Sequence, residues 1–155
     1  MGRLYTVQFE NVAVTAAQDF FEISPADDKP VIIHAIHLSQ HSDTGDTAEE
    51  MLRLSIIRGH TTSGSGGSAP TPAPLDPNDA AAGFAAEVNN TTIASTGTTV
   101  TLHSESFNIR SGWVYMPTPE CRPKASQGNT TIVVRLNAAP ADSLSMSGTI
   151  YVEEL

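Results

Sequence analysis

LSMSGTIYVE, residues 144–153, alternates between apolar and polar side chains. Successive side chains of an extended chain point to opposite faces, so a period of two is typical of a strand with one face in a core. The apolar face would hold Leu144, Met146, Ile150 and Val152. The stretch therefore predicts a half-buried β-strand, which needs further strands beside it.

The same alternation recurs along the chain. It is clearest in residues 5–9, 51–58, 98–104 and 130–137. In 98–104 the residues expected to be buried are Val100 and Leu102. Weaker strand candidates are Val12–Ala16, Phe20–Ile23, Ala85–Val88, Phe107–Arg110 and Trp113–Met116. VIIHAIHLS, residues 31–39, is apolar on both faces, which predicts a central strand covered on each side.

Many short strands separated by polar turns are typical of a sandwich or a jelly roll. Seventeen Thr and 15 Ser also favour strand, because β-branched and hydroxyl side chains suit a pleated, half-buried surface. A length of 155 residues is near the usual size of one domain. We therefore expect an all-β, single-domain antiparallel β-sandwich, jelly-roll-like, spanning residues 1–155.

The charge of the chain argues against several classes of partner. Its formal net charge is −9, and its only lysines are Lys29 and Lys124, so it would repel a phosphate backbone and is not expected to bind nucleic acid. No apolar run approaches the roughly 20 residues of a membrane helix, so no membrane association is expected. The single Cys121 excludes an internal disulfide and fits synthesis in a reducing cytoplasm.

Residues 59–80 form a long Gly/Ser/Pro-rich segment between two strand-rich parts of the chain. A phosphate-binding loop is excluded, because its glycines are followed by Pro70, Pro72 and Pro74 and by no Lys. A linker between domains is disfavoured, because the preceding part is marginal as a separate domain. We expect a loop within one domain, flexible in its Gly/Ser half, that orders against a partner or a neighbouring subunit.

No catalytic, cofactor or metal site is predicted. His34 and His37 are three residues apart on one strand, so their side chains are expected on opposite faces. The acidic turn with Asp43, Asp46, Glu49 and Glu50 lacks EF-hand spacing, and a solvated turn is favoured over a calcium site. A GxSxG nucleophile elbow is absent from the sequence, and Cys121 has no evident base beside it.

Trp113 and Tyr115 form the one aromatic patch, beside Pro117 and Pro119. Such a pair could stack on sugars or anchor a protein partner. A lone Trp more often packs in the core of a small sandwich, and this interpretation is favoured for Trp113. The candidate partner-binding residues are Thr61, Thr62, Ser63, Pro70, Pro72, Pro74, Trp113 and Tyr115.

Four stretches together resemble small virion proteins of tailed bacteriophages: FENVAVTAAQDFFEISPADDKP, IIRGHTTSGSGGSAPTP, AAGFAAEVNNTT and SGTIYVEEL. The resemblance implies a non-enzymatic capsid decoration or cement protein. It would bind the major capsid protein on the virion surface after synthesis in the bacterial cytoplasm. A decoration protein would cover seams between capsid subunits at symmetry axes, and three copies around one axis, a homotrimer, are the expected assembly. The alternative is a receptor- or carbohydrate-binding module of a tail fibre or baseplate.

Overall fold

The strand predicted from residues 144–153 lies at the centre of a sheet. β11 (Leu144–Glu154) alternates between buried and half-buried side chains along its whole length. It pairs antiparallel with β1 (Arg3–Val14) on one side and with β3 (Val31–Gln40) on the other. The prediction for this stretch is confirmed, and the sheet that contains β11 is called sheet A below.

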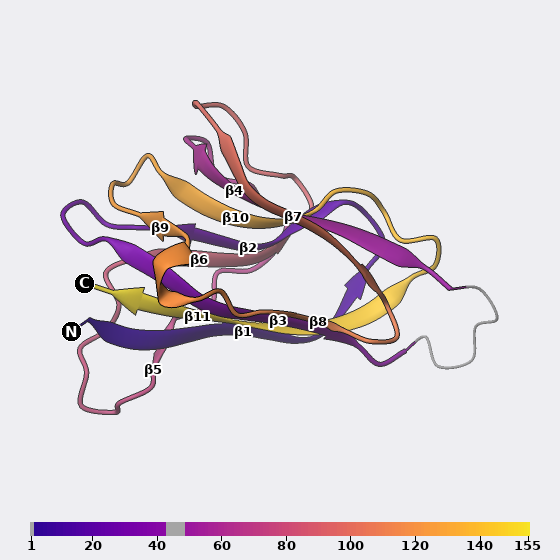
Figure 1. The fold of residues 1–155 in the computed structure, drawn as a ribbon, viewed down its shortest axis with the longest axis horizontal. Helices are drawn as coiled ribbons and strands as arrows, with labels where there is room; N and C mark the ends of the chain where they lie inside the picture. The colour runs from indigo at the N-terminus through magenta and orange to yellow at the C-terminus, as the bar shows by residue number, and fades with distance from the viewer. Residues whose placement is uncertain (1, 43–48) are drawn as a thin grey trace.

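The computed structural model describes residues 2–42 and 49–155, which form two antiparallel sheets (Figure 1). Sheet A has the order β5-β1-β11-β3-β8, and β9 also pairs with β3. Its short strands are β5 (Ala73–Pro74), β8 (Trp113–Tyr115) and β9 (Lys124–Ala125). Sheet B has the order β6-β2-β10-β4-β7. Its strands are β2 (Gln18–Ser24), β4 (Met51–His60), β6 (Ala85–Asn90), β7 (Val100–Asn108) and β10 (Thr131–Leu136).

One hydrophobic cluster fills the space between the sheets. Its members include Val7, Ile150 and Val152 from sheet A and Phe21, Leu54 and Val134 from sheet B. Burying one such side chain contributes roughly 1.5–3 kcal/mol, so this layer is the main source of stability. The only helix in the described part of the chain is a 3-10 turn, η1 (Pro119–Cys121). The all-β sandwich prediction is confirmed.

β3 was expected to be covered on both faces, but the strands so covered are β2 and, from Thr131 to Val134, β10. Every residue of β2 from Gln18 to Ile23 is buried, whereas β3 leaves Ile32, His34 and His37 partly exposed on one face. The apolar run of β3 suggested cover on both sides, but only its inner face reaches the core. The run QDFFEIS gave no such signal because its covered outer face is polar.

Irregular strands caused two further errors. Val100 is half-exposed on the edge strand β7, which has a register shift opposite Ile56 and Ile57. A second register shift lies between Tyr151 and Val152 of β11, which pair with Ala35 and Ile33 of β3. The extra residue in β3, His34, interrupts the alternation of its side chains between the two faces. As a result His34 contacts Glu153 and His37 contacts Tyr151, so both rings lie on the outer face of sheet A. The expectation that they point to opposite faces was wrong.

Residues 2–42 and 49–155 include no helix that is long and apolar enough to span a membrane.

Candidate functional site

Two segments fold over the outer face of sheet B, and we call residues 61–68 and 91–96 the cap. Reciprocal backbone hydrogen bonds join Thr62 to Ser95, both at 3.0 Å. Ser65 and Thr92 are joined in the same way at 2.9 and 3.0 Å. Ser68 is joined to Val88 of β6 at 3.1 and 2.8 Å. The Gly/Ser half of the long loop is thus an ordered part of the domain, and the expectation of flexibility there was wrong.

The Pro-rich half is also fixed to the domain. Ala73 and Pro74 form β5 and pair with Thr6 and Tyr5 of β1 at the edge of sheet A. The Tyr5 hydroxyl donates to the Ala80 carbonyl at 2.8 Å. Pro70, Pro72 and Pro74 are half-buried, in contrast to the exposed Thr61, Thr62 and Ser63. The segment therefore runs from sheet B to sheet A along one side of the sandwich.

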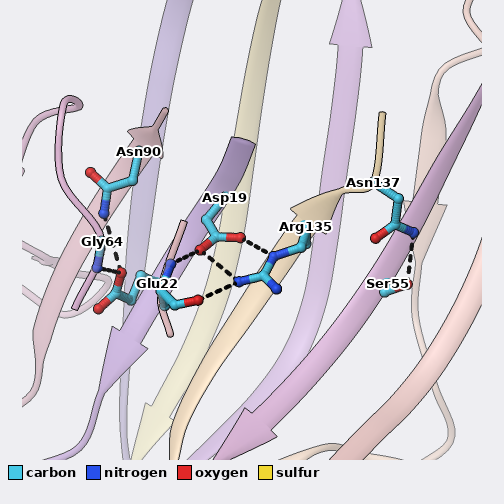
Figure 2. A network of polar contacts seen from close by, with 8 residues as sticks. Asp19, Glu22, Ser55, Gly64, Asn90, Arg135 and Asn137 are labelled. Atoms are coloured by element: carbon cyan, nitrogen blue, oxygen red, sulfur yellow. Dashed lines mark hydrogen bonds and ion pairs between the residues drawn. The ribbon is translucent and has the colours of Figure 1, made fainter. Parts of the chain in front are cut away.

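Buried carboxylates of β2 hold the cap from below (Figure 2). Asp19 accepts two hydrogen bonds from the Arg135 guanidinium, at 2.6 and 3.2 Å, and one from the Ala94 amide at 2.8 Å. Arg135 in turn donates to the Ala94 carbonyl at 3.0 Å. Asp19 is fully buried, and such a two-pronged ion pair is both strong and directional. Both backbone groups of Ala94 are therefore fixed.

Glu22 holds the other cap segment. Its carboxylate accepts hydrogen bonds from the Gly64 amide at 3.0 Å and from the Asn90 side chain at 3.2 Å. The side-chain oxygen of Asn90, Oδ1, accepts a hydrogen bond from the Gly67 amide at 3.2 Å. Figure 2 shows Gly64 and Asn90 converging on Glu22, which lies three residues after Asp19 on the same strand, β2. Because these groups are buried, removing one partner leaves the other unsatisfied.

His60, at the end of β4, lies at the edge of this polar network. Its ring is buried and its Nδ1 atom has no hydrogen-bond partner. Burial, with a smaller contribution from the Arg135 charge, lowers the pKa of His60. The ring is therefore held neutral at neutral pH.

The outer surface of the cap is rich in hydroxyl groups and has no charged side chain. Its exposed hydroxyl residues are Thr61, Thr62, Ser63, Ser65, Ser68, Thr91, Thr92, Ser95 and Thr96. The Thr96 hydroxyl bonds to those of Thr61 and Thr62, at 2.7 and 2.6 Å. Ile93 is 41% exposed among them. Three of the predicted partner-binding residues, Thr61, Thr62 and Ser63, thus lie on a fixed surface without charged side chains of its own, and Ser63 donates to the neighbouring Glu87 carboxylate at 2.7 Å.

The remaining two candidates lie on another side of the sandwich, where β7 approaches β8. Trp113 is 4% exposed and belongs to the core cluster, so the core interpretation of this residue is confirmed. Its indole N–H donates to Glu105 at 2.9 Å, and Glu105 also contacts His103 at 2.9 Å. These two hydrogen bonds lower the pKa of Glu105. Tyr115 stacks on Trp113 at 5.7 Å and is half-buried.

A groove adjoins Tyr115 and is lined by basic residues. It comprises two hollows, of about 350 and 440 Å³, that share Arg58 and Lys124. The first hollow is also lined by Tyr115, Cys121 and Arg122. Arg122 and Lys124 are close in sequence, but Arg58 is far from them along the chain, so only the fold shows that the three residues lie together.

The remaining candidates from the sequence are metal ligands and the acidic turn. No group of three or more His, Cys, Asp or Glu residues in 2–42 and 49–155 is placed to hold a metal ion. Asp43 and Asp46 of the acidic turn lie outside the described residues. Comparison with protein-family models, with curated proteins and with solved structures finds no match for the chain. The resemblance to phage virion proteins therefore stays a prediction.

Proposed function

We propose that the chain is a non-enzymatic virion protein of a tailed bacteriophage, which binds the major capsid protein and stabilises the head. The observation that supports this most is the cap. The buried carboxylates of Asp19 and Glu22 and the largely buried Arg135 fix this surface. Its exposed side chains are hydroxyls and one isoleucine. Groups held in place before binding lose little entropy on binding, and uncharged groups are less costly to desolvate.

The fold is compatible with this role. The strands β1 to β4 alternate between the sheets, as do β10 and β11: β1, β3 and β11 belong to sheet A, and β2, β4 and β10 to sheet B. This alternation fits the jelly-roll-like arrangement predicted from the sequence, an architecture that is used in viral capsid proteins. Assembly as a trimer remains part of the proposal, because closed symmetric oligomers repeat one contact surface.

Burial of Trp113 weakens the alternative of a carbohydrate-binding module. Stacking on a sugar needs an accessible aromatic face, whereas the Trp113 ring lies in the core and its N–H is already bonded to Glu105. A sugar could stack on Trp113 only if the ring left the core. We therefore favour protein attachment over glycan recognition.

The test is binding of the purified chain to phage heads that lack it, measured by co-sedimentation. Ser65→Lys with Thr92→Lys places two charges on the exposed cap without touching Asp19 or Glu22. Burying these charges at a contact should weaken binding at least tenfold, which corresponds to about 1.4 kcal/mol.

The matched control is Thr15→Lys with Ala138→Lys, at exposed positions outside the cap. This control should bind like the unmodified chain. Failure of the unmodified chain to bind heads would contradict the function, and equal binding by both double variants would contradict the role of the cap. Sedimentation equilibrium tests the trimer, and a monomer at all concentrations would disprove it.

A further inference from the structure

Three of the eight basic residues of the chain line the groove beside Tyr115: Arg58, Arg122 and Lys124. They come from β4, from the residue after η1 and from β9. The Arg58 guanidinium donates to the Lys124 carbonyl at 2.9 Å, which fixes its position at the point shared by the two hollows. On a chain with a net charge of −9, this groove is a local concentration of positive charge.

These three charges are not held in ion pairs within the described part of the chain. Among residues 2–42 and 49–155, none of the three cations forms an ion pair with a carboxylate, although Glu120 also lines the groove. The Nε atom of Arg122 is buried without a hydrogen-bond partner. Unsatisfied buried donors are rare and costly, and like charges in one groove repel each other. An anion bound in the groove would relieve the repulsion between the cations.

The chemistry of the groove selects the kind of anion. A guanidinium matches the planar geometry of a carboxylate, so Arg58 and Arg122 suit this group. The acidic chain repels a polyanion, which favours a ligand with few charges. Val100, paired in register with Arg58, is 50% exposed, and Met116, next to Tyr115, is 70% exposed. Exposed apolar side chains beside cations suit a polypeptide better than a sugar.

We infer that the groove binds carboxylate side chains from an acidic, partly apolar segment of a partner protein. This inference rests on the proposed attachment function and specifies a second contact, separate from the cap. Arg58 and Arg122 would each donate paired N–H hydrogen bonds to a carboxylate, and Lys124 would supply a further positive charge. The Tyr115 ring would form the apolar wall of the site.

The first experiment uses a synthetic peptide, acetyl-Ala-Glu-Leu-Glu-Ala-amide, titrated into the folded protein and followed by NMR. We expect shifts of the Arg122 and Lys124 amide resonances, and no shifts with the matched peptide in which Gln replaces Glu. Lys124→Gln should weaken binding at least tenfold and, because this side chain is exposed, should not impair folding. Arg58→Gln should have the same effect on binding.

The control variant is Arg53→Gln, which removes the same charge from the same strand outside the groove. It should leave peptide binding unchanged. Absence of peptide binding, or equal binding by Lys124→Gln and Arg53→Gln, would overturn the inference. Tighter binding of glucuronate than of the peptide would also overturn it, in favour of an acidic saccharide.

Head binding separates this inference from the proposed function. If Lys124→Gln binds heads as the unmodified chain does and the peptide does not bind, the groove is not a contact and the function stands. If the peptide binds the groove but the unmodified chain does not bind heads, the proposed function fails and the groove site stands.

Discussion

Asp19 and Glu22 place two carboxylates inside a β-sandwich, where each satisfies backbone groups of a segment distant in sequence. Removing a charge from such a buried site changes stability more than removing a charge from the surface. The attraction within a buried pair offsets the desolvation of both partners only while both are present. The Asp19–Arg135 pair therefore holds the cap in place more than it adds net stability.

Asp19→Ala tests this interpretation. It leaves Arg135, which is 14% exposed, without its counter-charge and leaves the Ala94 amide without an acceptor. We expect the free energy of unfolding to fall by about 3–5 kcal/mol, measured by urea denaturation. Glu10→Ala removes an exposed carboxylate from β1 and should change stability by less than about 0.5 kcal/mol. Similar losses for the two variants would refute the structural role of the pair.

The sequence predicted Thr61, Thr62 and Ser63 as partner-binding residues but did not predict the charged residues beneath them. Asp19, Glu22 and Arg135 lie beside apolar residues in β2 and β10. Charged residues in such strands are consistent with a solvated outer face, so the sequence of these strands does not reveal that they are buried. Only the pairing of β2 with β10 brings Asp19 opposite Arg135.

Among the elements, the cap depends on close backbone approach at its glycines. A Cβ atom at Gly67 would overlap the Val88 carbonyl, to which the neighbouring Ser68 amide is bonded. Backbone atoms cannot move aside as a flexible side chain can. The Gly/Ser composition that suggested flexibility thus serves tight packing against β6.

Gly67→Ala should therefore open the bridge between Ser68 and Val88. We expect at least tenfold faster hydrogen exchange of these two amides, with no change in the amides of β11. Gly128→Ala is a suitable control, because its added Cβ would lie 3.2 Å from the Asp27 side chain, which can give way. Unchanged exchange at Ser68 and Val88 would show that the cap tolerates a side chain at Gly67.

Alternation predicted strands reliably where one face is buried and the other is solvated, as in β11, and failed where this condition is broken. β7 is an edge strand with a register shift, so its alternation did not place Val100 in the core. β2 is covered on its polar face by the cap, which its own sequence cannot reveal. The groove was not predictable for the same reason, since its residues meet only through tertiary packing.

In the whole molecule, the two ends of the described chain lie side by side (Figure 1). β1 pairs with β11 from Arg3 opposite Glu154 to Val14 opposite Leu144. The Glu153 carboxylate accepts a hydrogen bond from the Gly2 amide at 3.0 Å and contacts His34 at 2.7 Å. Sequence patterns gave the strands and the sandwich but not this order, because alternation says nothing about which strands are neighbours.

A chain that ends at residue 142 should fail to fold. It lacks β11, so β1 and β3 lose their shared partner and the core loses Leu144, Met146, Ile150 and Val152. We expect no cooperative thermal transition by circular dichroism. A chain that ends at residue 154 loses the exposed Leu155 and the hydrogen bond from its amide to the Pro30 carbonyl, and it should still melt cooperatively. A cooperative transition in the shorter chain would show that sheet A closes without β11.

The central place of β11 has a consequence during biosynthesis. Residues 144–154 are synthesised after all the other described strands, so sheet A stays open between β1 and β3 until they have been made. Products of premature termination would expose the facing edges of β1 and β3 to proteases and chaperones.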